Sequence, residues 1–218
     1  FDPRGIRQLA VQARPLGSLL AGINNLMEER LTEMKKIAVF FGTGYEEIEA
    51  LTVVDICRRC GLEVETVSVM EQQEVTGSHG IPVRMDKMYG EADFSEYDML
   101  VLPGGMPGTK HLEAHGGLME QVDAFHAAGK YIAAICAAPS IFGHRGILKG
   151  RRACCYPGFE SHLEGAQVTE GPVEISDHVV TSRGMGTAMD FALAIAGIFC
   201  GPEKAREMAG SIVYGKAE

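Results

Sequence analysis

The chain has 218 residues, of which 46% are hydrophobic and 22% are charged, which excludes a disordered or collagen-like polypeptide. Its formal net charge of -9 argues against a protein that grips phosphates over a broad basic face, so we expect no nucleic-acid groove. The apolar stretches at 131–142 and 191–200 are shorter than the roughly 20 residues that cross a bilayer, so we expect no membrane partner.

Residues 1–33 form a leader that is distinct from the rest of the chain. Leu16, Leu20, Ile23 and Met27 recur at helical spacing and predict one amphipathic helix. The leader holds a single serine, which disfavours an organellar transit sequence. We interpret it as a tag, an appended helix or a mis-started segment, and we expect one folded domain over residues 34–218.

Beyond the leader, short apolar runs alternate with helical patterns. We predict strands at 37–41, 64–70, 99–102 and 131–135, helices at 46–60, 118–128 and 188–199, a hairpin within 173–182, and a last helix from 202. This alternation predicts an α/β fold with a mostly parallel sheet covered by helices on both faces. Ligands of such sheets bind at the carboxyl ends of the strands, so the loops at 42–44, 103–105 and 136–139 are the candidate site.

The segment Ala134-Ile135-Cys136-Ala137-Ala138-Pro139 is the most informative of the three. A nucleophile on a tight strand-to-helix turn needs small neighbours, because its own backbone is strained. A helix that starts just after Cys136 would favour the thiolate and lower the pKa of this cysteine. The alternative is a buried cysteine at an alanine-rich strand end.

Glycines and carboxylates mark the other two loops. In Pro103-Gly104-Gly105, the glycines allow backbone N–H groups to approach a substrate oxygen, as an oxyanion hole requires, although a plain turn has the same composition. In the helix that starts near residue 46, we expect Glu46 and Glu47 to be solvated, whereas Glu49 follows an otherwise apolar row and points inward. Burial would raise the pKa of that carboxyl. Glu46 shares a similar row, so the periodicity does not choose between Glu46 and Glu49.

These motifs, in this order, resemble the ThiJ/PfpI superfamily, in its deglycase and glyoxalase III-like branch linked to Parkinson disease. The resemblance rests on four segments: Glu46-Glu47-Ile48-Glu49, Leu102-Pro103-Gly104-Gly105, Ala134-Ile135-Cys136-Ala137, and Ser182-Arg183-Gly184-Met185-Gly186-Thr187. It covers about residues 35–214, nearly everything beyond the leader.

The resemblance implies a flavodoxin-like α/β sandwich with a nucleophile elbow, a homodimer, and no cofactor or metal. It implies that Cys136 is the nucleophilic and oxidisable cysteine and that Glu49 is its partner. The backbone N–H groups of Gly105 and Ala137 match the oxyanion-binding pair. Reported activities of the branch are the conversion of methylglyoxal to lactate, a disputed deglycation of proteins and nucleotides, and redox-responsive protection.

The chain also departs from its relatives. Ala137 stands where the protease-like branch has a histidine after the cysteine, which disfavours proteolysis. Tyr156 stands where some deglycase relatives have a histidine. His79 follows Ser78 in place of an arginine seen in some relatives, so His79 is a candidate pocket residue.

The remaining cysteines and histidines add no separate site in the sequence. The six cysteines accompany an ample core, so we expect reduced thiols in a cytoplasmic setting. The seven histidines show no metal-ligand spacing.

We therefore predict a cofactor-free cysteine enzyme that acts on a small aldehyde or glycated substrate through the Cys136 thiolate and Glu49. The alternative is a stress sensor or chaperone whose Cys136 is oxidised to a sulfinate without turnover.

Overall fold

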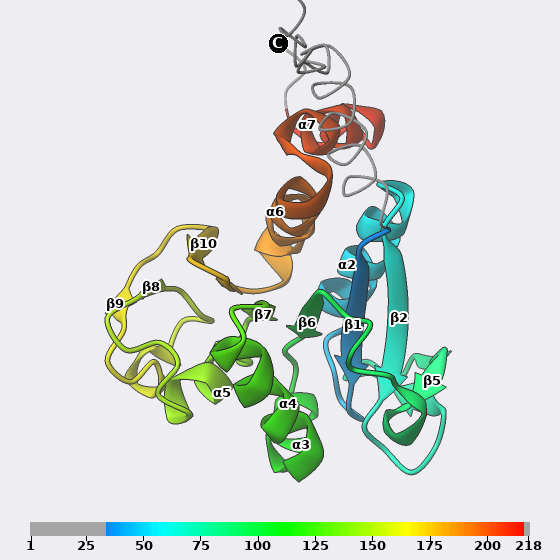
Figure 1. Ribbon diagram of the computed structural model, residues 1–218, viewed down its shortest axis with the longest axis vertical. Coiled ribbons are helices and arrows are strands. Elements are labelled where there is room, and N and C mark those ends of the chain that lie inside the picture. Colours follow the sequence, from blue (N-terminus) through cyan, green and yellow to red (C-terminus); the bar gives the residue numbers. More distant parts are fainter. Residues whose placement is uncertain (1–33, 216–218) are drawn as a thin grey trace, which may run out of the picture. The chain divides into compact units, whose positions relative to one another are not determined.

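The structure is a computed structural model that describes residues 34–215, and the chain from Lys35 onward forms one compact unit (Figure 1). The leader helix expected within residues 1–33 lies outside the described residues. None of the described helices combines the length and the apolar character that crossing a bilayer requires.

A seven-stranded sheet forms the centre of the described unit, in the strand order β10-β11-β7-β6-β1-β2-β5. The strands are β1 Lys36–Phe41, β2 Glu63–Ser68, β5 Lys87–Met88, β6 Met99–Leu102, β7 Tyr131–Ile135, β10 Val173–Ser176 and β11 Val179–Ser182. Every neighbouring pair is parallel except β10 and β11. The strands β2-β1-β6-β7-β11 follow the flavodoxin-like order, which confirms the predicted fold class.

Helices cover both faces of this sheet (Figure 1). On one face the core includes residues of α2 (Glu47–Arg59), α6 (Ala188–Cys200) and α7 (Pro202–Ser211). On the other face it includes residues of α3 (Gly108–Ala114), α4 (Gly116–Ala127) and α5 (Pro139–His144). The central strand β1 shows why: Ile37 and Val39 belong to the first core, and Ala38 and Phe40 to the second. Such a strand is apolar throughout because water reaches neither face.

Short elements complete the described chain. They are the hairpin β3 (Glu74–Thr76) and β4 (Pro82–Arg84), the pair β8 (Arg152–Ala153) and β9 (Gln167–Val168), and the 3-10 helices η1 (Tyr89–Glu91), η2 (Glu160–His162) and η3 (Met185–Thr187). The sequence patterns do not predict α3, because Leu112 is its one large buried apolar side chain and no helical row is visible.

The strand order reverses between β1 and β6, which are neighbours in the sheet although β2 follows β1 in the chain. A reversal of this kind separates the loops at the carboxyl ends of the two strands and leaves a crevice for a ligand. The loops after β1, β6 and β7 all lie at the carboxyl ends of these strands, and they are the three segments that the sequence marks as candidates.

Candidate active site

Two of the three loops are joined by backbone hydrogen bonds. The N–H of Glu46 donates to the carbonyl oxygen of Gly104 over 3.0 Å, and the N–H of Gly108 donates to that of Gly44 over 3.2 Å. A Cβ atom at Gly105 would lie 2.3 Å from the backbone nitrogen of Glu46, and Gly105 has a φ of +90°. Only glycine fits this position, because both the close approach and the left-handed backbone exclude a side chain.

Cys136 occupies a strained turn directly after β7. Its φ is +67°, which a residue with a Cβ atom rarely adopts. The N–H of Cys136 donates to the carbonyl of Ser182 over 3.0 Å, and its own carbonyl accepts from the N–H of Tyr156 over 2.8 Å. These two hydrogen bonds hold the turn in place, and the predicted elbow is therefore present. Cys136 itself is half-buried, so part of its surface is accessible.

Glu49 lies against this cysteine in the first turns of α2. Its side chain is 1% exposed, its Oε2 accepts the N–H of Gly104 over 2.9 Å, and its carboxyl is hydrogen-bonded to the Cys136 thiol. A Cβ atom at Gly104 would lie 2.7 Å from Glu49 Oε2 and 3.0 Å from Cys136 Sγ, so only a glycine lets the two groups approach each other here. The structure thereby decides between Glu46 and Glu49 in favour of Glu49.

The two groups influence each other's protonation. Burial raises the pKa of Glu49 to about 7, against the smaller opposing effects of the hydrogen bonds from Cys136 and Gly104. Burial also raises the pKa of Cys136, and the nearby Glu49 charge raises it further. Two negative charges in contact in a buried site repel strongly, so the pair keeps at least one proton over the neutral pH range.

This finding corrects the expectation of an intrinsically acidic Cys136. The helix that follows, α5, begins only at Pro139 and has six residues, so its dipole acts weakly on the sulfur. The N–H groups of Gly105 and Ala137 do lower the pKa of Cys136, but burial and Glu49 outweigh them. The same two N–H groups form the pair expected to bind an oxyanion, and both lie close enough to Cys136 to lower its pKa.

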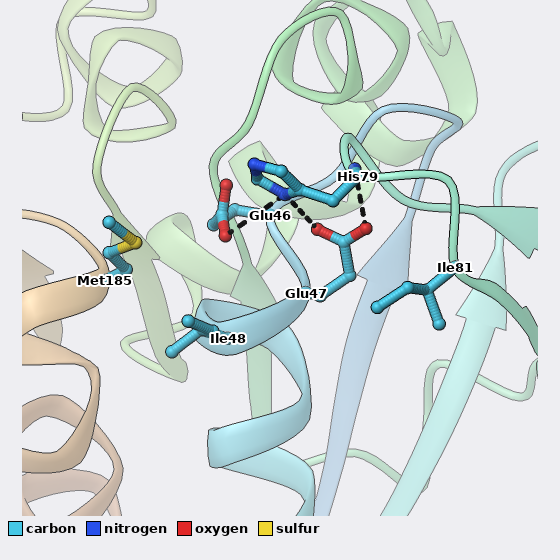
Figure 2. Close-up of a pocket in the computed structure, with 6 residues that line it drawn as sticks. All are labelled: Glu46, Glu47, Ile48, His79, Ile81 and Met185. Atoms are coloured by element: carbon cyan, nitrogen blue, oxygen red, sulfur yellow. Dashed lines mark hydrogen bonds and ion pairs between the residues drawn. The ribbon is translucent and has the colours of Figure 1, made fainter.

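A second cluster lies on the outer side of α2, around His79 (Figure 2). Its imidazole Nδ1 is 2.9 Å from Glu47 Oε2 and 3.9 Å from Glu46 Oε1, and its backbone N–H donates to Glu47 Oε1 over 2.8 Å. Ser78 Oγ donates to the same carboxylates at 3.1 and 3.2 Å. The expectation that Glu47 is solvated is therefore wrong, because its side chain is 7% exposed.

Electrostatics accounts for this buried carboxylate. Burial alone would raise the pKa of Glu47, but the hydrogen bonds from His79 and Ser78 lower it to about 2. Among the described residues, Glu46, Glu47 and His79 form a group in which one potential metal-ligand atom of each side chain lies within 4.8 Å of the others. Glu47 is hydrogen-bonded to His79, and Ser78 Oγ donates to both carboxylates, so we assign the cluster the structural role of tying the loop at 77–81 to the start of α2. His79 lines a pocket here with Ile48, and it is not among the groups that shift the pKa of Cys136.

Tyr156 and Gly184 complete the surroundings of Glu49. Tyr156 is 50% exposed, and its ring lies beside Gly184, which in turn lies near Glu49 Oε1. The sequence marks Gly184 as part of a motif but suggests no function for it, and it does not single out Gly104 as the residue that anchors Glu49. Both roles depend on contacts between loops that are far apart in the chain, which no local pattern reveals.

Fold and site together define a flavodoxin-like α/β protein in which a cysteine on an elbow turn is paired with a buried glutamate. The catalytic roles of Cys136, Glu49, Gly105 and Ala137 stay predictions, although the structure brings all four together.

Comparisons with known proteins agree with this class. The pattern of the DJ-1/PfpI family matches residues 35–197, and the chain belongs to that family. Protein DJ-1 homolog B of Arabidopsis thaliana is 38% identical over 181 residues, which are 82% of this chain and 41% of that protein. Glutathione-independent glyoxalase DJR-1.2 of Caenorhabditis elegans is 32% identical over 164 residues, covering 75% of this chain and 87% of the relative.

Solved structures show the same fold. Oxidised DJ-1 of Toxoplasma gondii superposes with a TM-score of 0.80 at 34% identity, covering 84% of this chain and all of that one. DJ-1beta of Drosophila melanogaster also has a TM-score of 0.80, at 29% identity. The chain spans less than half the length of DJ-1 homologs A and B of Arabidopsis thaliana, at 46% and 41%.

Proposed function

We propose that the chain is a cofactor-free cysteine enzyme that converts a small 2-oxoaldehyde, such as methylglyoxal, to the corresponding 2-hydroxy acid. The observation that carries this proposal is the contact between the Cys136 thiol and the buried Glu49 carboxyl, whose pKa is raised to about 7. A general base works best when its pKa is close to the working pH, and this one is already hydrogen-bonded to the nucleophile. The similarity to a glutathione-independent glyoxalase supports the same reaction class.

In this mechanism, ionised Glu49 takes the thiol proton as Cys136 Sγ attacks the aldehyde carbon. The new oxyanion is stabilised by the N–H groups of Gly105 and Ala137, and it then takes the proton back from Glu49. Glu49 next removes the proton of the aldehyde carbon and returns it to the neighbouring carbon. The proton of the hemithioacetal hydroxyl passes to the oxygen of that neighbouring carbon, which leaves a thioester of the 2-hydroxy acid. Water hydrolyses that thioester and frees the thiol, so the sum is methylglyoxal plus water giving lactate.

The pairing of Cys136 with Glu49 does not favour proteolysis. The relatives include a putative cysteine protease of Bacillus subtilis, but Ala137 follows the cysteine in this chain. A peptide amide needs a protonated leaving nitrogen, for which a histidine beside the nucleophile is the usual acid. An aldehyde has no leaving group, so a single carboxyl is sufficient.

The deciding experiment is turnover of methylglyoxal by the wild type and by Cys136→Ser, with lactate as the measured product. We expect the wild type to form lactate and the variant to lose activity by at least about 1,000-fold, because an alkoxide is far harder to generate than a thiolate at neutral pH. Ile175→Ala, an exposed position on β10, is the control and keeps the wild-type rate. A Cys136→Ser variant with the wild-type rate would rule out the mechanism.

The second candidate function is a redox sensor in which Cys136 becomes a sulfinate. It is favoured by one observation, the partial exposure of Cys136 beside a carboxyl that can donate a hydrogen bond to a sulfinate oxygen. Mild peroxide followed by intact-mass measurement distinguishes the two functions. A gain of about 32 Da without any lactate formation by the untreated protein supports the sensor.

A further inference from the structure

A mostly apolar recess adjoins the Cys136–Glu49 pair and has no part in the chemistry derived above. Its volume is about 330 Å³, and the residues that line it include Tyr156, Pro157 and Met185 together with Arg183 and Gly184. The recess is tied to the cysteine through the backbone, since the N–H of Tyr156 donates to the carbonyl of Cys136. This hydrogen bond places the backbone of Tyr156 next to that of the reacting cysteine.

One atom of the site faces this region without a partner. Glu49 Oε1 is buried and accepts no hydrogen bond from the described residues, whereas Oε2 is bonded to Gly104. A buried carboxylate oxygen without a donor is costly, and in an active site it marks a place where a ligand supplies the donor. During the proposed isomerisation the second carbon of the substrate comes to carry a hydroxyl, which is such a donor.

The space beside that oxygen is open at Gly184. A methyl group placed on Gly184 would lie 3.2 Å from Tyr156 Cδ2 and 3.8 Å from Glu49 Oε1, and these are its nearest neighbours. The 3.2 Å approach to the Tyr156 ring is tighter than an ordinary carbon contact, so only a glycine at this position leaves space between the ring and the acceptor oxygen. A substrate whose hydroxyl reaches Glu49 Oε1 must direct its substituent through this gap into the recess.

We propose that this recess is the substituent subsite of the enzyme, and that it selects 2-oxoaldehydes that carry an aromatic group over those that carry a methyl group. The proposal rests on the proposed function. A methyl group fills only the gap over Gly184, while an aryl ring extends against Tyr156 and Pro157 and gains contact with the Met185 thioether. Aromatic rings and thioethers both pack favourably on such a surface. Tyr156 is thus a specificity-determining residue.

The test compares kcat/KM for phenylglyoxal and methylglyoxal, and the measured quantity is the ratio of the two within each variant. We expect Tyr156→Ala to lower this ratio about tenfold, mainly through the KM for phenylglyoxal, because a ring contact contributes up to about that factor. Tyr156→Phe keeps the ring and is expected to keep the ratio. Gly184→Ala fills the gap and is expected to lower the ratio as well, and Ile175→Ala controls for surface changes.

Two results would overturn the subsite. One is an unchanged ratio in Tyr156→Ala, and the other is an equal loss of the ratio in Tyr156→Phe, which would assign the effect to the hydroxyl instead of the ring. Calorimetric binding of mandelate and lactate to the wild type gives a readout that needs no turnover, with mandelate expected to bind about tenfold more tightly. If the enzyme turns over neither aldehyde but still binds mandelate more tightly than lactate, the proposed function is rejected and the subsite is not. If it turns over both aldehydes but binds mandelate and lactate equally, the subsite is rejected and the proposed function is not.

Discussion

Cys136 and Glu49 share a proton, and this sharing determines how each of them behaves. A cysteine with its pKa raised by burial is a poor nucleophile when isolated. Next to a carboxylate that can take its proton during attack, the same cysteine needs no free thiolate. The reactive form is the pair with one negative charge, whichever of the two groups holds the remaining proton.

The pH dependence of the reaction follows from this pair. Below the Glu49 pKa of about 7 the carboxyl is protonated and cannot accept the thiol proton, so kcat/KM for methylglyoxal is expected to rise with pH through a midpoint near that value. Glu49→Gln is expected to abolish the rise and to lower kcat/KM about 100-fold or more. The measurement is a pH–rate profile, with the exposed Glu164→Gln as the control for altered net charge. A flat wild-type profile across this midpoint would contradict the role of Glu49.

The strained backbone at Cys136 makes a prediction about stability. A side chain at a φ of +67° costs about 1 kcal/mol, so Cys136→Gly is expected to exceed Cys136→Ala in free energy of unfolding by about that amount. Ala138, two residues on, has ordinary helical angles of -65° and -25°, and there Ala138→Gly is expected to destabilise. Urea unfolding measures both differences. Equal stability of the two Cys136 variants would mean that the turn carries no strain.

At the scale of elements, the site depends on how β1 is held between β2 and β6. Lys36 at the start of β1 has its Nζ 3.1 Å from carboxylate oxygens of Glu63 and Glu65 and 2.6 Å from one of Glu96. The lysine side chain is only 11% exposed. Three carboxylates thus converge on one cation at the amino end of β1, and the active site lies at the carboxyl end of the same strand.

Removing this cation takes the shared partner away from three carboxylates, of which Glu65 retains Lys87 at 2.9 Å. Lys36→Met is expected to lower the free energy of unfolding by roughly 3 kcal/mol. The matched control is Lys35→Met, whose partner Asp98 lies 3.0 Å away at a more exposed position, and it is expected to cost at most about 1 kcal/mol. Denaturant unfolding of both variants measures the contrast, and similar losses would show that burial of the Lys36 network adds nothing.

At the scale of the whole molecule, the homodimer that the family resemblance implies stays a prediction. Apolar side chains of Ile48, Ile81 and Met185 line the pocket in Figure 2 and are 53%, 51% and 57% exposed. Large apolar groups gathered in one exposed place favour association. We therefore expect the second copy of the chain to cover Ile48 and Ile81.

Sedimentation equilibrium tests this expectation. The wild type is expected to sediment with the mass of two chains, and Ile48→Glu to shift it towards one, because a buried glutamate without a partner opposes association. Ile175→Glu, with the same substitution at an equally exposed position on β10, is expected to leave the mass unchanged. A monomeric wild type would contradict the homodimer, and a dimeric Ile48→Glu would place the interface elsewhere.

The α/β class, the boundaries of β6 and β7, and the three loops that carry the site can all be predicted from the amino-acid sequence. It could do so because apolar strands, helix-ending glycines and small residues around Cys136 are local features, readable from neighbours in the chain. It did not predict α3, whose residues form no apolar row, nor the burial of Glu47, which requires His79 from a distant loop.

Which glutamate faces the cysteine, and in which direction the two pKa values shift, depends on contacts between distant elements and is seen only in the folded chain. Glu46 and Glu49 share the same helical periodicity, and Gly104 from another loop selects Glu49 by donating its N–H to that carboxylate. The pKa of Cys136 depends on burial and on a charge from a different element, so the helix dipole expected from the sequence was outweighed. Periodicity describes one element at a time, whereas desolvation and charge coupling depend on every element packed around the group.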